Sequence, residues 1–223
     1  MKAGNCAYKC PEDLAAIIPV FPLPGALLLP RAELPLNIFE PRYLAMIDAA
    51  IAGKRIIGMI QPDDAAPPQP RGPSLRAIGC AGRITSLAET GDDRYVLTLT
   101  GICRFRVLEE LEVATPFRQC RVTAMAYQTD FAFCVREDSV DRPSVLRTFR
   151  AYLDAHNLET DWDSVDSASN ETLINALAMM APFGCAEKQA LLEAPDLRSR
   201  AETLVAITEM SLARESGRSG TLQ

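Results

Sequence analysis

Histidine and lysine are scarce in this sequence, which limits the catalytic chemistry that it can support. His156 is the single histidine among 223 residues. The lysines are Lys2, Lys9, Lys54 and Lys188, and none accompanies a recognisable peptidase serine motif. A serine–lysine dyad can be assembled by folding from distant positions, so spacing alone leaves that alternative open. The sequence itself indicates no catalytic residue.

A phosphate-binding loop is also missing. Such a loop follows a strand and has the pattern Gly-x-x-x-x-Gly-Lys-Ser/Thr, in which the first glycine precedes the Gly-Lys pair by four intervening residues. Gly53-Lys54 is the one Gly-Lys pair, but Asp48 stands where the first glycine is needed and Arg55 replaces Ser/Thr. We therefore predict that the chain does not hydrolyse nucleoside triphosphates.

No metal or cofactor site is expected either. Cys6 and Cys10 have a spacing that could suggest metal ligands, but the only histidine is far away in sequence. Structural zinc sites normally take four Cys or His ligands. A loose terminal segment is the favoured interpretation of this cysteine pair.

An uncharged run extends from Leu14 to Pro30, nearly long enough to suggest a membrane span. Four prolines within it (Pro19, Pro22, Pro24 and Pro30) exclude a spanning helix, because each removes a backbone donor and lipid cannot satisfy the groups set free. The run is interpreted as short buried strands and tight connections.

The cysteines favour a reducing compartment. There are seven, an odd number, at widely scattered positions. Pro11, Glu12 and Asp13 separate Lys2 from the apolar run, so no signal peptide is convincing. Free thiols in a cytoplasmic protein are the simplest interpretation, with Cys80, Cys103 and Cys120 as small buried residues of predicted strands.

Charge is unevenly distributed along the chain. Residues 1–127 carry 14 Lys and Arg against 13 Asp and Glu, a net charge of +1, whereas residues 128–223 carry 9 against 16, a net charge of −7. Nucleic-acid binding depends on a basic face. The balance therefore disfavours RNA binding, although local patches are possible.

The first half of the chain has the pattern of a β-domain with one helix. Strands are predicted at 17–21, 26–29, 35–39, 56–60, 77–88, 95–100, 104–108 and 118–127. A helix is predicted from Pro41 to about Ile51, with proline at a favoured first-turn position. Residues 61–76 are polar and rich in proline, which is typical of a surface loop. Short alternating strands without long crossovers predict an antiparallel barrel or sandwich.

After Tyr127 the apolar spacing becomes helical. Helices are predicted at 142–155, 170–181, 186–193 and 195–210. The predicted organisation is a flexible extension (1–16), a β-barrel (17–127), a helical bundle (128–215) and a disordered tail (216–223). The fold class is therefore α+β.

Four motifs carry a family resemblance. They are Phe21-Pro22-Leu23 with Phe39-Glu40-Pro41-Arg42-Tyr43, then residues 79–84 (GCAGRI), residues 101–107 (GICRFRV), and residues 188–193 (KQALLE). In this order they resemble the amino-terminal substrate-binding domain of the Lon protease family. The resemblance covers roughly residues 17–213 and implies a PUA-like β-barrel followed by a helical bundle that binds protein substrates or partners. The ATPase and serine–lysine peptidase of a complete Lon protease are not recognised in the sequence.

The charged motif at the helix start is interpreted as structural. Glu40 would favour the positive end of the helix, and Arg42 would tie a neighbouring loop. A catalytic role for Glu40 lacks an acid or nucleophile nearby. Tyr43 is expected in the core.

Apolar surface is the expected basis of function. The predicted protein-binding surface comprises Phe21, Pro22, Leu23, Pro35, Pro67, Pro68 and Pro70. Met125, Met179, Met180 and Met210 could add an adaptable surface, but core packing is the favoured interpretation for them.

The predicted function is a non-catalytic module that binds unfolded or specific client proteins, as an adaptor or sequestering factor linked to proteolysis. The alternatives are a PUA-like RNA-binding module and a small-ligand-binding module. No cofactor and no membrane partner are expected.

Overall fold

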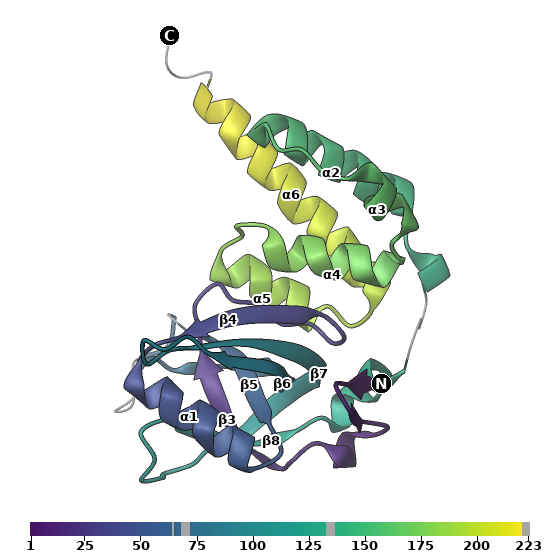
Figure 1. The fold of residues 1–223 in the computed structure, drawn as a ribbon. Helices are drawn as coiled ribbons and strands as arrows, with labels where there is room; N and C mark the ends of the chain where they lie inside the picture. Colours follow the sequence, from purple (N-terminus) through teal and green to yellow (C-terminus); the bar gives the residue numbers. More distant parts are fainter. Residues whose placement is uncertain (64, 68–71, 133–136, 220–223) are drawn as a thin grey trace. The chain divides into compact units, whose positions relative to one another are not determined.

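The computed structural model describes residues 1–63, 65–67, 72–132 and 137–219, with side chains up to residue 214. The chain forms two compact units, one of Met1–Phe133 with Pro182–Leu192 and one of Cys134–Ala181 with Glu193–Gln223 (Figure 1). The first unit contains β1 (Lys2–Ala3), β2 (Cys6–Ala7), η1 (Pro11–Asp13), β3 (Ile17–Pro22), β4 (Glu33–Ile38), α1 (Pro41–Ala52), β5 (Ile56–Pro62), β6 (Leu75–Glu89), β7 (Tyr95–Glu110), β8 (Arg118–Thr123), η2 (Met125–Phe131) and most of α5 (Cys185–Glu193). The second contains η3 (Glu137–Ser139), α2 (Arg142–His156), α3 (Trp162–Ser167), α4 (Asn170–Met180) and α6 (Leu197–Ser219).

The predicted barrel is confirmed as a closed ring of five strands. The strands follow the order β7-β6-β5-β3-β8, and β8 pairs with β7 again to close the ring. Strand β7 is 16 residues long, so its first half pairs with β4 while its second half reaches β8. Bulges between Ala81 and Gly82 and between Val107 and Glu109 bend the long strands, as closure requires.

The prediction of a wholly antiparallel barrel was wrong in one pair. β3 and β5 run parallel, with Val20 opposite Gly58 and Pro22 opposite Ile60, so the barrel is mixed. Parallel neighbours need a long crossover. Residues 23–55, which contain β4 and α1, provide this crossover between the two strands.

The predicted strand at 26–29 is a buried loop instead. Leu27, Leu28 and Leu29 are at most 3% exposed, and this burial explains the apolar pattern that suggested a strand. The loop is held by Gly101, whose nitrogen donates to Ala32 and whose carbonyl accepts from Arg31. A Cβ at Gly101 would collide with the carbonyl oxygen of Leu29, so glycine is required here.

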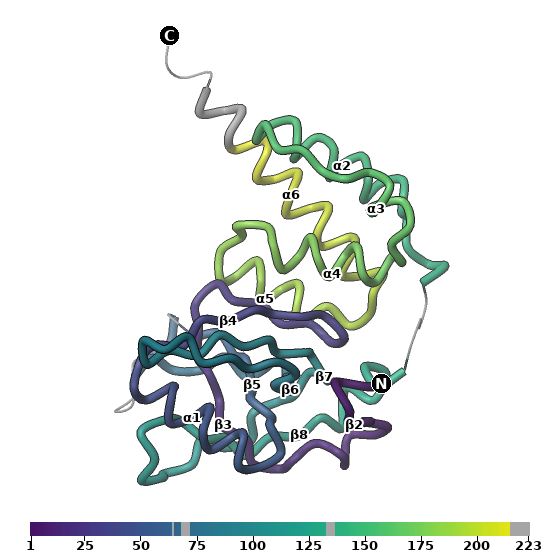
Figure 2. Tube along the Cα trace, in the orientation of Figure 1, coloured from purple at the N-terminus to yellow at the C-terminus, as the bar shows by residue number. Residues whose placement is uncertain are grey.

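Residues 1–16 pack on the barrel, which corrects the prediction of a flexible extension. Ala3, Tyr8 and Leu14 are buried in one cluster with Phe105 and Cys103. The nitrogen of Val122 donates to the carbonyl of Ala16, and the trace of the segment can be followed in Figure 2. The strands β1 and β2 have two residues each, which is too short for a strand pattern to be recognised in the sequence.

A buried ion pair joins β7 to η2. Arg104 and Asp130 have side chains only 3% and 7% exposed, and two bonds between them measure 3.0 Å (Nε to Oδ2) and 2.8 Å (Nη2 to Oδ1). The main-chain nitrogen of Arg104 also donates to Asp130 at 2.9 Å. The guanidinium lies 4.8 Å from the ring of Tyr127. Burial alone would lower the pKa of Arg104, but the hydrogen bond and charge of Asp130 outweigh burial and raise it.

Helix α5 belongs to the barrel unit rather than to the helical unit. The amide of Gln189 donates to the carbonyl of Ile78 at 3.1 Å, and Arg104 Nη1 lies 3.4 Å from the carbonyl of Leu192. Leu191 and Leu192 are buried. The short apolar face of α5 therefore contributes to the core of the first unit.

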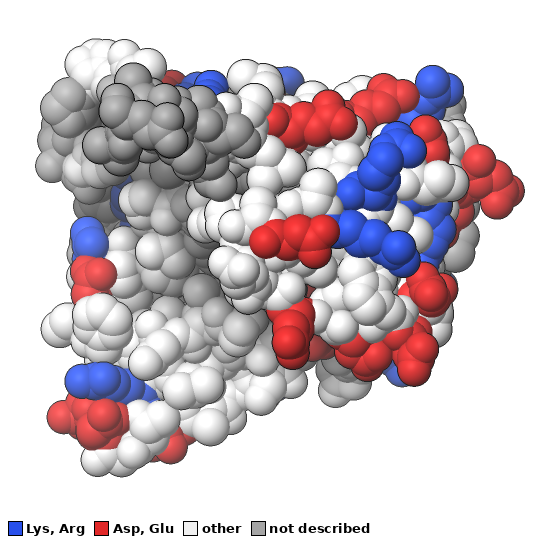
Figure 3. Space-filling view, turned by 90° about the horizontal axis from the view of Figure 1, so that it is seen from above, with Lys and Arg blue, Asp and Glu red and all other residues white. Residues whose placement is uncertain are grey.

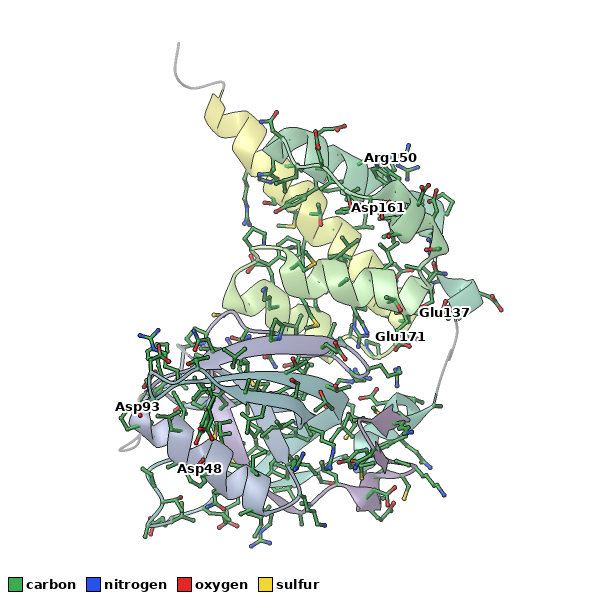
Figure 4. All side chains as sticks on the ribbon, viewed as in Figure 1. Asp48, Asp93, Glu137, Arg150, Asp161 and Glu171 are labelled. Carbon is green, nitrogen blue, oxygen red and sulfur yellow. The ribbon has the colours of Figure 1, made fainter. Side chains whose placement is uncertain are left out.

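In the helical unit, charged side chains form hydrogen bonds with the free backbone groups at the ends of neighbouring helices. The Glu137 carboxylate accepts from the nitrogens of Asn170 and Glu171, both at 3.0 Å, at the start of α4 (Figure 4). Arg142 Nη2 donates to the carbonyl of Val165 at 2.7 Å, and its Nη1 donates to Ala168 at 3.0 Å. These bonds connect η3, α2, α3 and α4 through groups that the helices leave unsatisfied.

The methionine and cysteine predictions had different outcomes. Core packing was the wrong interpretation for Met125, Met180 and Met210, which are 64%, 83% and 54% exposed. Met125 lies in η2, Met180 at the end of α4 and Met210 in α6, and each side chain lies on an outward face. By contrast, Cys80, Cys103 and Cys120 are at most 1% exposed, as predicted.

Removing one member of the buried ion pair should destabilise the protein strongly. We expect Asp130→Ala to lower the free energy of unfolding by about 3–5 kcal/mol, because it leaves the Arg104 charge buried and unpaired. The double replacement Arg104→Met/Asp130→Leu should recover much of this loss. Urea unfolding measures both, with Arg198→Ala in an exposed pair as the control, expected to cost less than about 1 kcal/mol. An Asp130→Ala cost no larger than that of Arg198→Ala would contradict the importance of the pair.

Alkaline pH should destabilise the protein through its buried thiols. Burial raises the pKa of Cys103 strongly, and it raises the pKa of Cys120 to about 12. The folded state therefore keeps these protons where the unfolded chain, with a thiol pKa of about 8.5, releases them. This contribution to stability is complete below pH ~8.5 and is lost as pH rises toward the folded pKa, by about 1.4 kcal/mol per thiol per pH unit.

Urea unfolding between pH 7.5 and 9.5 measures this dependence. The variant Cys103→Ala/Cys120→Ala should be less stable at neutral pH but should show a weaker decline toward pH 9.5. An equally steep decline in this variant would assign the effect to other groups.

Candidate functional site

The barrel unit carries a pocket of about 510 Å³. It is formed where the end of β3, the end of β5, the start of α1 and the loop before β8 come together. Half of its ten lining residues are prolines. The lining residues are Pro22, Pro24, Arg42, Tyr43, Pro62, Pro73, Thr115, Pro116, Phe117 and Arg118, which we call the proline pocket.

The prolines make the pocket wall stiff. Each proline ring fixes φ near −65°, so the wall loses little conformational freedom when a ligand binds. Pro24 and Pro116 are exposed at the rim, whereas Pro62 is buried. Apolar walls with a few polar groups are typical of small-molecule and peptide sites.

Arg42 and Tyr43 place the charged motif of α1 in the pocket. Arg42 donates from Nε to Glu40 Oε2 at 2.9 Å, and its guanidinium lies 4.5 Å from the centre of the Tyr43 ring. Tyr43 is 7% exposed and packs on Phe21 with ring centroids 4.2 Å apart, which confirms its predicted core position. Burial raises the pKa of Tyr43. The Glu40–Arg42 pair is exposed, and Glu40, which directly precedes α1, makes no side-chain bond to the start of the helix.

Arg118 fixes the opposite side of the pocket. Its Nε and Nη2 donate to the two carboxylate oxygens of Glu110 at 2.7 and 2.5 Å. Its Nη1 donates to the carbonyl of Pro73 at 2.7 Å. The guanidinium therefore ties Pro73, just before β6, to β7 and β8, and it does so from a buried position that makes the pair rigid.

The predicted protein-binding surface overlaps the pocket only in part. Pro22 lines it. The prediction that Phe21 belongs to an exposed surface was wrong. Its side chain is 5% exposed, because β3 points it inward against Tyr43. Leu23 is half-buried and Pro35 and Pro67 are exposed, but these three lie outside the lining. Pro68 and Pro70 lie outside the described residues.

Most of the lining was missed by sequence reasoning. Pro24, Pro62 and Pro73 were noted only as parts of an apolar run and a loop. Thr115-Pro116-Phe117 lies between two predicted strands and also places a proline beside an aromatic residue, but nothing in the sequence shows that this connection meets the other parts of the pocket. Arg118 read only as the first residue of a strand.

The described surface carries charges of both signs. In the face drawn in Figure 3, red and blue side chains are interspersed, and no broad basic field is visible among the described residues. No group of three or more His, Cys, Asp or Glu side chains with metal-binding geometry occurs in the described part of the chain. Within the same residues, no helix combines the length and apolar character needed to cross a membrane.

Curated relatives of this chain are Lon proteases. The Lon protease of Syntrophus aciditrophicus (strain SB) is 25% identical over 213 residues, which cover 92% of this chain and 26% of that protein. Lon protease 2 of Myxococcus xanthus is 31% identical over 118 residues, which cover 53% of this chain and 14% of that protein. The chain thus spans about a quarter or less of the length of these relatives.

Solved structures with the same fold are Lon N-terminal domains. A Lon N-terminal domain protein from Xanthomonas campestris matches with a TM-score of 0.58 and 23% identity, covering 86% of this chain and 98% of that chain. The N-terminal domain of Mycobacterium avium complex Lon protease matches with a TM-score of 0.63 and 18% identity over the same shares. At these identities the likeness establishes the fold, a mixed barrel with helices.

The sequence itself matches a family model over most of its length. The matched residues are 17–209, and the model describes the ATP-dependent protease La (LON) substrate-binding domain. This range contains the strands of the closed barrel and the helices from α1 to α5. The chain belongs to the family of LON substrate-binding domains.

Proposed function

We propose that the barrel unit binds apolar segments of unfolded or specific client proteins in the proline pocket. The observation that carries this proposal is the rigid lining of five prolines, Tyr43 and Phe117 around a volume of about 510 Å³. This volume lies within the range of about 300–1,000 Å³ that is usual for ligand sites. A stiff apolar wall favours binding because few side chains must be ordered.

The role that we propose is non-catalytic. Among the described residues of the proline pocket there is no carboxylate, imidazole or thiol that could act as base, acid or nucleophile. Arg42 and Arg118 supply donors for carbonyl or carboxylate oxygens of a bound segment. Their own carboxylate partners, Glu40 and Glu110, offset their charge.

The cellular role that we propose is that of an adaptor or sequestering factor linked to proteolysis. Family membership and the Lon protease relatives support this link. We place the activity in the cytoplasm, because the described cysteines are free thiols.

Charge placed at the pocket rim should weaken client binding. We expect Pro24→Asp and Pro116→Asp each to raise the Kd of fluorescein-labelled, carboxymethylated unfolded casein about tenfold, roughly 1.4 kcal/mol, because an apolar segment would meet a carboxylate. Fluorescence anisotropy measures the Kd. Binding should persist at about 0.5 M salt, because apolar contacts are screened far less than exposed charge pairs.

Two exposed prolines outside the pocket provide matched controls. Pro35→Asp and Pro67→Asp make the same chemical change elsewhere on the barrel unit, and should leave the Kd unchanged. Equal weakening by all four variants would contradict the assignment to the proline pocket. Steeply salt-dependent binding to RNA would instead support the nucleic-acid alternative.

A further inference from the structure

The helical unit has a groove of its own. It has a volume of about 550 Å³ and lies between the start of α2 and one face of α6. The face of α6 is contributed by residues three or four positions apart, which is the spacing of a single helix face. The lining residues are Ser139, Val140, Asp141, Ser144, Val145, Arg198, Ala201, Glu202, Val205, Ala206 and Glu209, which we call the α2–α6 groove.

Small apolar side chains form the floor of the groove. Val145 and Ala201 are 3% and 4% exposed, and Val140 and Val205 are half-buried beside them. Ala206 is exposed at the edge. Alanine and valine leave hollow space where larger residues would fill it, so the floor offers contact area to an aliphatic side chain from another molecule.

Acidic side chains dominate the rim. Asp141, Glu202 and Glu209 face a single base, Arg198, which gives the lining a net charge of −2. Arg198 is already paired with Glu202 at 2.8 Å, and both side chains are more than 60% exposed. The groove therefore combines an apolar floor with unbalanced negative charge.

The start of α2 opposes this charge only weakly. A helix N-terminus carries about +0.5 of an elementary charge. The Asp141 carboxylate accepts from the nitrogen of Ser144 at 3.1 Å, so this end is capped from within the chain. Just outside the lining, Arg147 Nη2 donates to Ser144 Oγ at 3.2 Å and Asp138 is exposed next to Ser139, so these two charges offset each other and the excess of negative charge is that of the lining itself.

We infer that the α2–α6 groove binds a cationic amphipathic segment of a partner protein, in which Lys or Arg flank one or two aliphatic side chains. The aliphatic groups lie on the floor of Val140, Val145 and Val205, and the cations face Glu202 and Glu209. Electrostatic complementarity of this kind selects partners and speeds their encounter. The surface is separate from the proline pocket and suits a partner of different chemistry.

Peptide binding to the full chain tests the inference. The probe is a fluorescein-labelled peptide of Leu and Lys, two heptads long, with Leu on one helical face, and its counterpart carries Glu in place of Lys. The Lys peptide should bind and the Glu peptide should not. Glu209→Lys should raise the Kd about three- to tenfold by replacing an attraction with a repulsion. Ala206→Phe should weaken binding similarly by filling the groove without a change of charge.

Matched controls separate the groove from general attraction to an acidic protein. Asp154→Lys and Ala151→Phe make the same changes at exposed positions of α2 outside the lining, and should leave the Kd unchanged. Circular dichroism of each variant confirms folding, and Pro24→Asp should have no effect on this peptide. Equal loss in the control variants, equal binding of both peptides, full competition by spermine alone, or no binding of the Lys peptide at about 1 mM would each overturn the inference.

Discussion

The barrel unit depends on the buried pairing of Arg104 with Asp130. A guanidinium and a carboxylate removed from water are tolerated only when each finds charge and hydrogen bonds in place. In this pair each group has both. Neighbouring segments also bond to the two residues: Arg31 donates to the carbonyl of Asp130, and Arg104 approaches the carbonyl of Leu192. One ion pair thus brings the buried loop before β4, strand β7, η2 and the end of α5 into a single arrangement.

In the proline pocket, too, a paired arginine holds a neighbouring segment through a backbone carbonyl. Arg118, paired with Glu110, donates to the carbonyl of Pro73, so this residue before β6 is held by a buried side chain rather than by regular structure. Tyr43 has a similar effect from α1 through its packing on Phe21. These two sides of the pocket can therefore be stiff, because Arg118 anchors Pro73 and Tyr43 packs on Phe21 of β3.

The sequence predicted features that depend on local pattern, and it missed those that depend on long-range pairing. Proline at the start of α1, the helical spacing after Tyr127 and the buried cysteines were all readable from nearby residues. The parallel pairing of β3 with β5 was not, since crossover length alone does not reveal which strands meet. The pocket shows the same limit: Pro22 was identified, but Pro116 and Arg118 are brought to it from the other end of the barrel sequence.

The placement of α5 has a consequence for how this fold can be divided. The chain leaves the barrel unit after residue 133, returns for residues 182–192 and leaves again. A fragment that ends with η2 would lack Gln189, and the carbonyl of Ile78 would lose the donor that it has in the whole chain. The two units therefore cannot be separated by a single cut in the chain. A gene rearrangement that preserved the barrel unit would have to keep α5, and with it the segment of the second unit that lies between η2 and α5 in the sequence.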